Sequence, residues 1–278
     1  MSGAAFRRSR RKQSNVCNYQ PCAALQDYVR SYTIAYMVSK QTMIMRQPAF
    51  PHHYLIFYPK EGQYYSNDGN SFHRLSKELI AAFTKPVYLT ISPLQITIIV
   101  TLIPGSLHRL TRMPLYEITN RPLDGVNGFG NELRGVNDQL SDAKTQQNMI
   151  QIIEKFLLKK IEAAKEMIPI DHAFKLLINS PGQYSIEQVA SISCVSLRQL
   201  ERQFLERIGS SPTTFIRQVR FTKALRIKRA HPERNWTTIA NECGYFDQMH
   251  LIRDFKLFTD ATPNSLNRFI PAPNLTFA

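Results

Sequence analysis

One pattern of residues occurs twice in the last third of the chain, in copies that begin about 50 residues apart. Each copy opens with a residue that can cap a helix, Ser185 in the first and Asn235 in the second, and continues with Ile, Val and Ala at helical spacing. Ala190 and Ala240 hold the equivalent place in the two copies, where a small side chain lets two helices approach closely. The repeat therefore predicts two helical hairpins of the same build.

A tight turn and a second helix complete each hairpin. The turns fall at Cys194 and Gly244, and each second helix has a core face at helical spacing, formed by Leu200, Phe204 and Ile208 and by Leu251, Phe255 and Phe258. This is the spacing of a helix-turn-helix, whose second helix enters the major groove of DNA. We expect the two motifs over residues 185–208 and 236–258. Residues 211–229 predict one long helix between them, with Ser211 as its cap and Pro212 in the first helical position.

These features resemble the AraC/XylS family of bacterial transcription regulators. The likeness rests on residues 209–221 with the helix that follows, and on residues 239–263, and it extends over about residues 171–270, roughly a third of the chain. It implies an α+β protein. The front part would be a small antiparallel β-barrel or sandwich, cupin-like and sensory, with added helices. The rest would be an all-α DNA-binding domain of two helix-turn-helix units joined by a linker helix.

The resemblance also implies which side chains touch DNA. The predicted base contacts are Arg198, Glu201 and Arg202 in the first recognition helix and Gln248, Met249, His250 and Arg253 in the second. Arg can pair with guanine and Gln with adenine, whereas Met offers only apolar contact. Two alternatives stay open: Glu201 as a solvated surface acid, and Arg253 as the ion-pair partner of Asp247 or Asp254. The predicted phosphate contacts are Arg217, Arg220, Lys223 and Lys256, although an exposed helix face often has the same composition.

Two residues depart from the family pattern at turns. Cys194 stands where such turns often have Gly, so we expect its backbone to avoid the left-handed conformation. Asp260 stands where the family often has Gly after the last helix. Asp tolerates the left-handed region better than most residues, so we expect this cap to form.

The front part has the composition that is typical of short strands. Apolar and β-branched runs at residues 32–38, 54–58, 63–65, 80–84, 87–91 and 95–103 are separated by turn residues. Helices are expected at residues 23–30, 107–113, 115–119 and 130–140, and a longer one, capped by Asp142, to about residue 166. The apolar stripe of that last helix could be a dimer face or could pack on the barrel. We therefore divide the chain into a disordered basic arm (1–16), a sensory domain (17–168) and a DNA-binding domain (169–278).

Aromatic residues of the front part suggest a ligand pocket. Phe57, Tyr58, Tyr65 and Tyr88 could line the barrel interior and bind an unidentified effector, or could be ordinary core and surface. The domain could instead serve for protein contact or dimerisation. Neither a cofactor nor a metal site is expected, because Cys17 and Cys22 supply only two thiols and the adjacent His52 and His53 would point to opposite faces of a strand.

Charge agrees with a nucleic-acid partner without requiring one. The net charge is +14, from 35 Lys and Arg against 21 Asp and Glu. Residues 1–12 hold five basic and no acidic groups, and residues 181–278 hold 13 basic and 8 acidic groups, a net of +5. The arm could follow DNA or be only a tail. No apolar run is long enough to span a membrane, and the four cysteines do not form a disulfide framework, so a cytoplasmic location is expected.

The sequence thus favours a DNA-binding transcription regulator, not an enzyme. Its expected partners are double-stranded DNA, RNA polymerase and an effector, with a homodimer as an option and activation as the expected sense of control. Two alternatives remain: a barrel-type enzyme fused to a DNA-binding module, and an interaction protein that has lost specific DNA binding.

Overall fold

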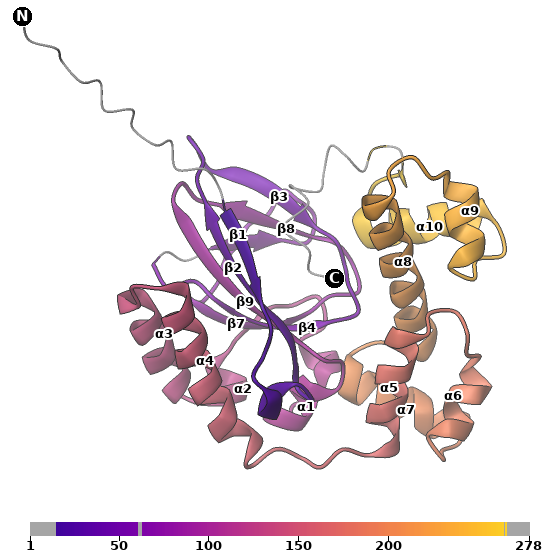
Figure 1. Cartoon of the computed structure of the whole chain (residues 1–278), viewed down its shortest axis with the longest axis horizontal. Coiled ribbons are helices and arrows are strands. Elements are labelled where there is room, and N and C mark those ends of the chain that lie inside the picture. The colour runs from indigo at the N-terminus through magenta and orange to yellow at the C-terminus, as the bar shows by residue number, and fades with distance from the viewer. Residues whose placement is uncertain (1–14, 61–62, 264, 266–278) are drawn as a thin grey trace, which may run out of the picture.

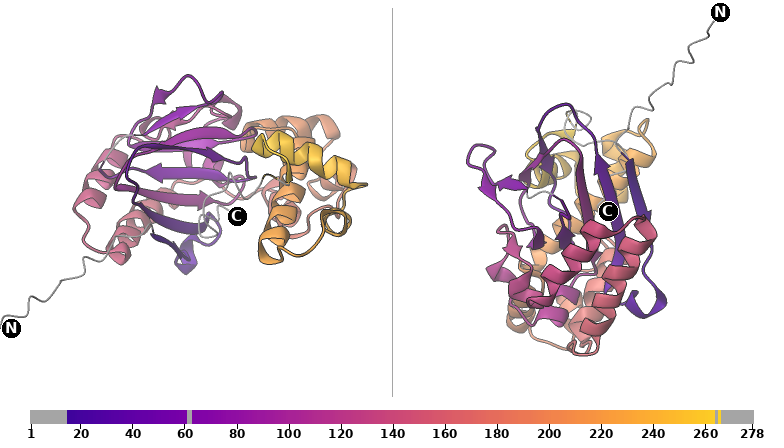
Figure 2. Two further views of the ribbon diagram at one scale, coloured as in Figure 1. Left: turned by 90° about the horizontal axis from the view of Figure 1, so that it is seen from above. Right: turned by 90° about the vertical axis from the view of Figure 1, so that its left-hand side faces the viewer.

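A computed structural model describes residues 15–60, 63–263 and 265 of the chain (Figure 1). Its front part is an antiparallel β-sandwich with helices on one side, and its C-terminal part is entirely helical and lies beside the sandwich (Figures 1 and 2). The expected α+β class is confirmed, and of the two forms considered the structure has a sandwich of two sheets and not a closed barrel.

The larger sheet has six strands in the order β1-β2-β9-β4-β7-β10. Their bounds are β1 Asn15–Tyr19, β2 Val29–Met37, β4 His53–Phe57, β7 Glu78–Ala82, β9 Gln95–Leu102 and β10 Leu123–Asp124. The smaller sheet has the order β3-β8-β5-β6, with bounds β3 Met43–Gln47, β5 Tyr64–Ser66, β6 His73–Arg74 and β8 Val87–Ile91.

Both faces of the larger sheet are covered. Because successive side chains of a strand point to opposite sides, β4 contributes to the packing on each face. Leu55 and Phe57 of β4 pack against the helices on the outer face, whereas Tyr54 and Ile56 face the smaller sheet. The outer helices are α1 Ser106–Thr111, η2 Leu115–Glu117 (a 3₁₀ turn), α2 Val126–Phe129, α3 Glu132–Asp142 and α4 Gln146–Ile161. Figure 2 shows α3 and α4 lying across this sheet.

The longest of these helices begins later than the sequence suggested. Asp142 ends α3, and Thr145 caps α4 by accepting a 3.1 Å hydrogen bond from the backbone N–H of Asn148. The expectation for Asp142 was wrong because the backbone at Ala143 is extended and breaks the helical path between α3 and α4. The apolar stripe of α4 is buried against the sheet, among residues such as Ile153 and Leu157. This favours packing over a dimer face.

The N-terminal expectations need two further corrections. The helix expected at residues 23–30 is only a 3₁₀ turn, η1 Ala23–Leu25, because Val29 already pairs with Leu102 of β9 and starts β2. Asn15 and Val16 belong to β1, where they pair with Tyr36 and Ala35, so they are not part of a disordered arm. The rest of the predicted arm, residues 1–14, lies outside the described residues.

The C-terminal helices follow the predicted pattern closely. They are α5 Pro169–Asn179, α6 Ile186–Ile192, α7 Leu197–Ile208, α8 Pro212–Ala230, α9 Trp236–Glu242 and α10 Gln248–Thr259. Ser185, Ser211 and Asn235 cap α6, α8 and α9 through their side chains, as the sequence predicted. Each cap satisfies a backbone N–H that the first turn of a helix leaves without a partner.

The two turns share one geometry, and this corrects the expectation for Cys194. Its φ is +55°, in the left-handed region, close to the +74° of Gly244. In both turns the following residue donates its N–H to the alanine carbonyl, Val195 to Ala190 at 3.1 Å and Tyr245 to Ala240 at 3.0 Å. The turn imposes the conformation whichever residue is present. Asp260 also adopts it, at φ +52°, and closes α10 as expected.

Candidate nucleic-acid interface

Two helix-turn-helix units, α6–α7 and α9–α10, share the linker helix α8. Phe215 near its start packs edge-on against Phe204 of the first unit, with ring centroids 5.8 Å apart. Phe221, further along, packs edge-on against Phe255 of the second unit at 4.9 Å. Because one continuous helix supplies a core residue to each unit, it sets the distance between them (Figure 1).

The two units also touch each other directly. Gly182, in the loop before α6, faces Gly244 in the second turn. A Cβ on Gly182 would lie 3.0 Å from the carbonyl oxygen of Cys243, and both glycines have positive φ. The absence of side chains here allows the close approach, so the relative placement of the units has a second constraint besides α8.

The first recognition helix presents its predicted readers to solvent. Arg198, Glu201 and Arg202 are exposed, while Leu200 and Phe204 on the opposite face are buried. The three exposed residues are spaced i, i+3 and i+4, so they lie on one face of α7. That face combines two guanidinium forks, which match the edge of guanine, with one carboxylate acceptor, which matches the amino group of cytosine.

The second recognition helix presents a different chemistry. Gln248 is half-buried, and its Oε1 accepts a 2.9 Å hydrogen bond from Thr237 in α9. Met249, His250 and Arg253 are exposed. Asp247 caps the helix by accepting a 2.7 Å hydrogen bond from the N–H of His250. The predicted base contacts of α10 thus comprise one amide, one thioether, one imidazole and one guanidinium.

Three of the four predicted phosphate contacts bind the protein itself. Arg217 lies 2.7 Å from the buried carboxylate of Asp254, so that acid pairs with α8 and not with Arg253. Arg220 donates to the carbonyl of Gly244 at 3.2 Å, and Lys223 donates to the carbonyl of Glu242 at 3.0 Å. These side chains hold α8 against the second unit. Lys256 is exposed on α10.

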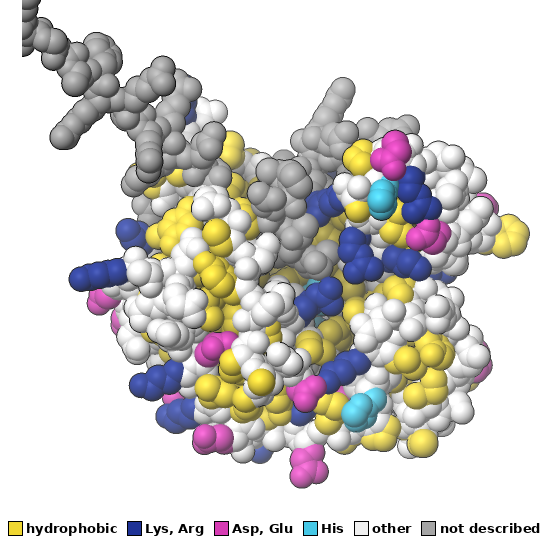
Figure 3. Space-filling view, viewed as in Figure 1, with side chains coloured by type: hydrophobic (Ala, Val, Ile, Leu, Met, Phe, Trp, Pro, Cys, Tyr) yellow, Lys and Arg dark blue, Asp and Glu magenta, His cyan; other side chains and the backbone are white. Residues whose placement is uncertain are grey.

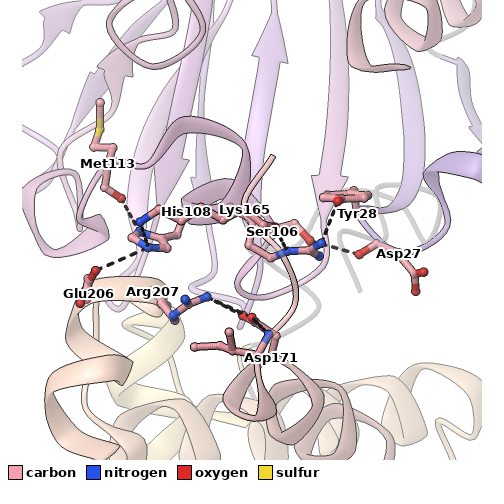
Figure 4. A network of polar contacts seen from close by, with 11 residues as sticks. Asp27, Tyr28, Ser106, His108, Met113, Lys165, Asp171, Glu206 and Arg207 are labelled. Atoms are coloured by element: carbon pink, nitrogen blue, oxygen red, sulfur yellow. Dashed lines mark hydrogen bonds and ion pairs between the residues drawn. The ribbon is translucent and has the colours of Figure 1, made fainter. Parts of the chain in front are cut away.

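The end of the first recognition helix docks on the sandwich domain through polar contacts (Figure 4). Within the helical part, Nη1 of Arg207 lies 3.0 Å from both carboxylate oxygens of Asp171, in a buried ion pair that joins α7 to α5 and holds the end of α7 in place. Glu206 reaches Nε2 of His108 in α1 at 3.5 Å. Burial, the largest cause, lowers the pKa of His108. Beyond the helix, Thr119 donates to the carbonyl of Gly209 at 2.9 Å.

The end of the second recognition helix docks on the sandwich as well. Ala49 donates its N–H to the carbonyl of Phe258 at 2.9 Å, and Tyr88 donates to a carboxylate oxygen of Asp260, also at 2.9 Å. Phe50 stacks on Phe221 of α8 with ring centroids 6.2 Å apart. One hydrophobic core therefore runs from the interior of the sandwich into the second unit. Sequence reasoning missed this interface, since each contact joins residues far apart in the chain.

The predicted pocket residues do not gather in one place. Tyr58 lines an apolar cavity between the two sheets. Tyr65 packs beside the same core, whereas Phe57 faces the helices on the far side of the larger sheet. Tyr88 lies on the outer side of β8, where it reaches Asp260. The polar groups of the cavity, which sequence reasoning missed, include three buried amide side chains, Gln47, Gln63 and Gln95.

A second hollow is basic and lies between the sandwich and α8. Arg30 of β2 meets Lys223 and Arg226 of α8 there, beside the buried His52. Burial, and secondarily Arg226, lower the pKa of Arg30. Burial lowers the pKa of His52 to about 3, so its imidazole is neutral, and its Nδ1 has no hydrogen-bond partner within the described part of the chain. Figure 3 shows Lys and Arg side chains gathered along this boundary.

We call this hollow the basic crevice. The residues that line it are Arg30, Pro51, His52, Ile178, Pro181, Val219, Thr222, Lys223 and Arg226, and none of them is acidic. Among the described residues, no group of three or more His, Cys, Asp or Glu side chains is placed to hold a metal ion. None of the described helices combines the length and apolar character that a membrane span needs.

Comparison with known proteins supports the DNA-binding part. Residues 189–268 match a family described as "Helix-turn-helix domain". The chain is similar to the HTH-type transcriptional activator RhaS of Klebsiella pneumoniae (strain 342), with 33% identity over 82 residues, or 30% of this chain and 29% of that protein. RhaS of Enterobacter sp. (strain 638) is 30% identical over 86 residues, 31% of each chain. The similarity thus spans less than a third of the length of these curated relatives.

Solved structures add distant likenesses. ToxT from Vibrio cholerae O395 aligns with 87% of this chain and 98% of its own at 12% identity and a TM-score of 0.46. The DNA-binding domain of AdpA, solved with a target DNA, aligns with 37% of this chain and 92% of its own at 19% identity and a TM-score of 0.34. The repeat, the matched family and the RhaS relatives agree that the C-terminal part is a helix-turn-helix domain.

Proposed function

We propose that this protein is a transcription regulator that binds a specific double-stranded DNA site and activates transcription together with RNA polymerase. The observation that carries the proposal is the pair of helix-turn-helix units on one linker helix, each with an exposed recognition face. The relatives that match this part are named as transcriptional activators. Action on DNA would place the protein in the bacterial cytoplasm. We propose no catalytic activity.

One chain has what it needs to read an asymmetric site. Two recognition helices that enter successive major grooves on one face of DNA are separated by about 34 Å, or roughly 10 base pairs. On this reading Arg198 and Arg202 select guanines in one half of the site, and Gln248 selects an adenine in the other. A homodimer is therefore an option for regulation, not a requirement for reading the site.

An in-vitro selection with the full chain, followed by mobility-shift titration, tests the DNA proposal. We expect a single enriched site, and a loss of about 5- to 150-fold in affinity for Arg202→Ala, since a bidentate contact to guanine contributes about 1–3 kcal/mol. Lys144→Ala is the matched control, because it removes one exposed charge between α3 and α4, away from both recognition helices. Selection of no sequence would refute DNA reading and support the interaction-protein alternative.

We place the regulatory effector in the basic crevice and assign it an anionic group. Arg30 comes from the sandwich domain and Arg226 from α8, and burial together with the nearby charge of Arg226 lowers the pKa of Arg30. A bound carboxylate or phosphate would relieve this repulsion and accept hydrogen bonds from both guanidinium groups. The unpartnered Nδ1 of His52, in its N–H tautomer, would supply one more donor.

Such a ligand would control DNA binding through domain docking. It would bind best when the sandwich and α8 are together, and it can shift that equilibrium by as much as its affinity differs between docked and undocked states. The ends of both recognition helices rest on the sandwich domain, so a change in docking would alter their placement. The proposal predicts that small anions change DNA affinity and that Arg226→Gln abolishes the response.

A second effector site is favoured by one observation, the cavity between the sheets. Its lining is apolar apart from the buried glutamines and one threonine, so it would suit an uncharged ligand with few polar atoms. Two variants separate the sites. Met45→Trp fills the cavity and should remove a response to an uncharged apolar effector, while Arg226→Gln should remove only a response to an anion. A small-molecule screen with mobility shift as the readout distinguishes them.

A further inference from the structure

Phe246 is the most exposed large apolar side chain among the described residues. It is 90% exposed, whereas the next, Leu94, is 62% exposed. Its neighbour Tyr245 is buried in the core of the second unit. Phe246 lies in the turn between α9 and α10, directly before the capping residue Asp247. At 90% exposure the ring contributes almost nothing to the core, so it is free to contact a partner.

The Phe246 ring has an aromatic neighbour and an exposed apolar residue close to it in sequence. It packs edge-on against the imidazole of His250, with ring centroids 6.1 Å apart. Met249, the residue before His250, is 55% exposed. We call Phe246 and Met249 the apolar tip of the second unit. The tip lies at the N-terminal end of α10, which is the end of a recognition helix that contacts base edges.

We propose that Phe246 is a specificity-determining residue that reads the 5-methyl group of a thymine in the major groove. This inference rests on the proposed DNA-binding function and adds a residue to its reading set. The thymine methyl is the apolar feature that the major-groove edges of the bases offer, and a phenylalanine side chain is one of the groups that contacts it. The adjacent carboxylate of Asp247 would repel phosphates, which favours placing this end at the base edges and not on the backbone.

The position of the ring favours DNA over a protein as the partner. Phe246 touches His250, a predicted base reader, and Met249 lies between that residue and Gln248. A protein docked on the apolar tip would cover the same side chains that face the groove. It would therefore compete with DNA instead of joining a protein–DNA complex.

Removal of single thymine methyl groups from the DNA tests the inference. The site from in-vitro selection is remade with each thymine replaced, one at a time, by deoxyuridine, which lacks only the methyl group. For the wild-type chain we expect at least one position where this change weakens binding about fourfold, the factor that corresponds to one buried methylene-sized group. For Phe246→Ala we expect that penalty to disappear while penalties at other thymines remain.

Two controls make the result specific. Leu257→Ala removes an exposed apolar side chain from the C-terminal half of the same helix and should keep every wild-type penalty. Phe246→Ala should keep the wild-type unfolding temperature, because the ring is almost fully exposed. A Phe246→Ala protein that retains all deoxyuridine penalties would overturn the inference, as would a wild-type chain with no penalty at any thymine. Unchanged DNA binding with lost activation in a transcription assay would also overturn it and would assign the tip to a protein partner. If selection yields no site at all, the proposed function itself fails, which is a separate result.

Discussion

Two adjacent buried histidines at the start of β4 should make this fold sensitive to mild acid. His52 and His53 are each 3% exposed. Burial lowers the pKa of His52 to about 3 and that of His53 to about 4. Both bear on domain docking, because His52 lines the basic crevice and Nε2 of His53 lies 3.1 Å from the carbonyl oxygen of Ile208 at the end of α7.

The sign and size of this change in the free energy of unfolding follow from proton linkage. In the unfolded chain a histidine has a pKa near 6.5, so at pH 5 it binds a proton that the folded chain does not bind. A lowered folded pKa therefore gives stability that is present above about pH 6.5 and is lost as the pH falls below it. At pH 5 the solution is about 1.5 pH units below the unfolded pKa, which corresponds to about 2 kcal/mol for each histidine and about 4 kcal/mol for the pair.

Urea unfolding at pH 7.5 and pH 5.0 measures this effect. The variant His52→Gln with His53→Gln does not titrate at these positions, so its stability should fall by about 4 kcal/mol less than the wild type between the two pH values. The comparison uses the change with pH, so a lower stability of the variant at pH 7.5 does not matter. His250→Gln, at an exposed histidine, should keep the wild-type change. Equal losses in the wild type and the double variant would show that these two histidines do not cause the acid sensitivity.

Three further results are expected. Gly209→Ala forces an L residue to a φ of +82° and adds a Cβ against the hydroxyl of Thr119 and the carbonyl of Leu115, so it should lower the free energy of unfolding by about 1–3 kcal/mol in urea. Gly135→Ala, in open space on α3, should not destabilise the fold. Arg207→Met leaves the carboxylate of Asp171 buried without its cation and should cost about 3–5 kcal/mol in the same assay, with part recovered when Asp171→Asn is added. Lys256→Ala should reduce the slope of log affinity for DNA against log salt by about one, and an unchanged slope would remove this residue from the phosphate contacts.

The C-terminal part could be predicted from sequence because its signals are local. A helix is held by hydrogen bonds between residues four apart, so a cap such as Ser185, an apolar period and a turn are all readable within one short window. The caps and the linker helix were correct for this reason. Cys194 was the exception, because the hydrogen bonds of the turn between Ala190 and Val195 require a left-handed residue even where the sequence has no Gly.

The sandwich was less predictable because its strands depend on distant partners. β3 was missed, since its pairing with β8 is the reason it is a strand. The helix predicted from Ala23 onward was wrong because Val29 pairs with Leu102 of β9 and so begins a strand. A composition rule identifies β-branched runs but does not identify the strand that will lie beside them.

The candidate site also has residues that could be found from the sequence and contacts that could not. The candidate base contacts on α7 and α10 came from the family resemblance and stay predictions; all of them are exposed except Gln248, which is half-buried. The internal bonds of Arg217, Arg220 and Lys223 depend on how α8 packs against the second unit, so a basic run could not reveal them. The basic crevice combines Arg30 with residues of α8 that are far away in the chain, and only the fold brings them together.

The most direct test of the account is a selection experiment that compares the wild type with Arg202→Ala and Gln248→Ala. We expect the wild type to enrich a site with two conserved blocks about 10 base pairs apart, centre to centre, which is one turn of DNA. Arg202→Ala should relax the sequence of one block only, and Gln248→Ala that of the other only. A single block, or two variants that leave both blocks unchanged, would contradict the claim that two recognition helices read successive grooves.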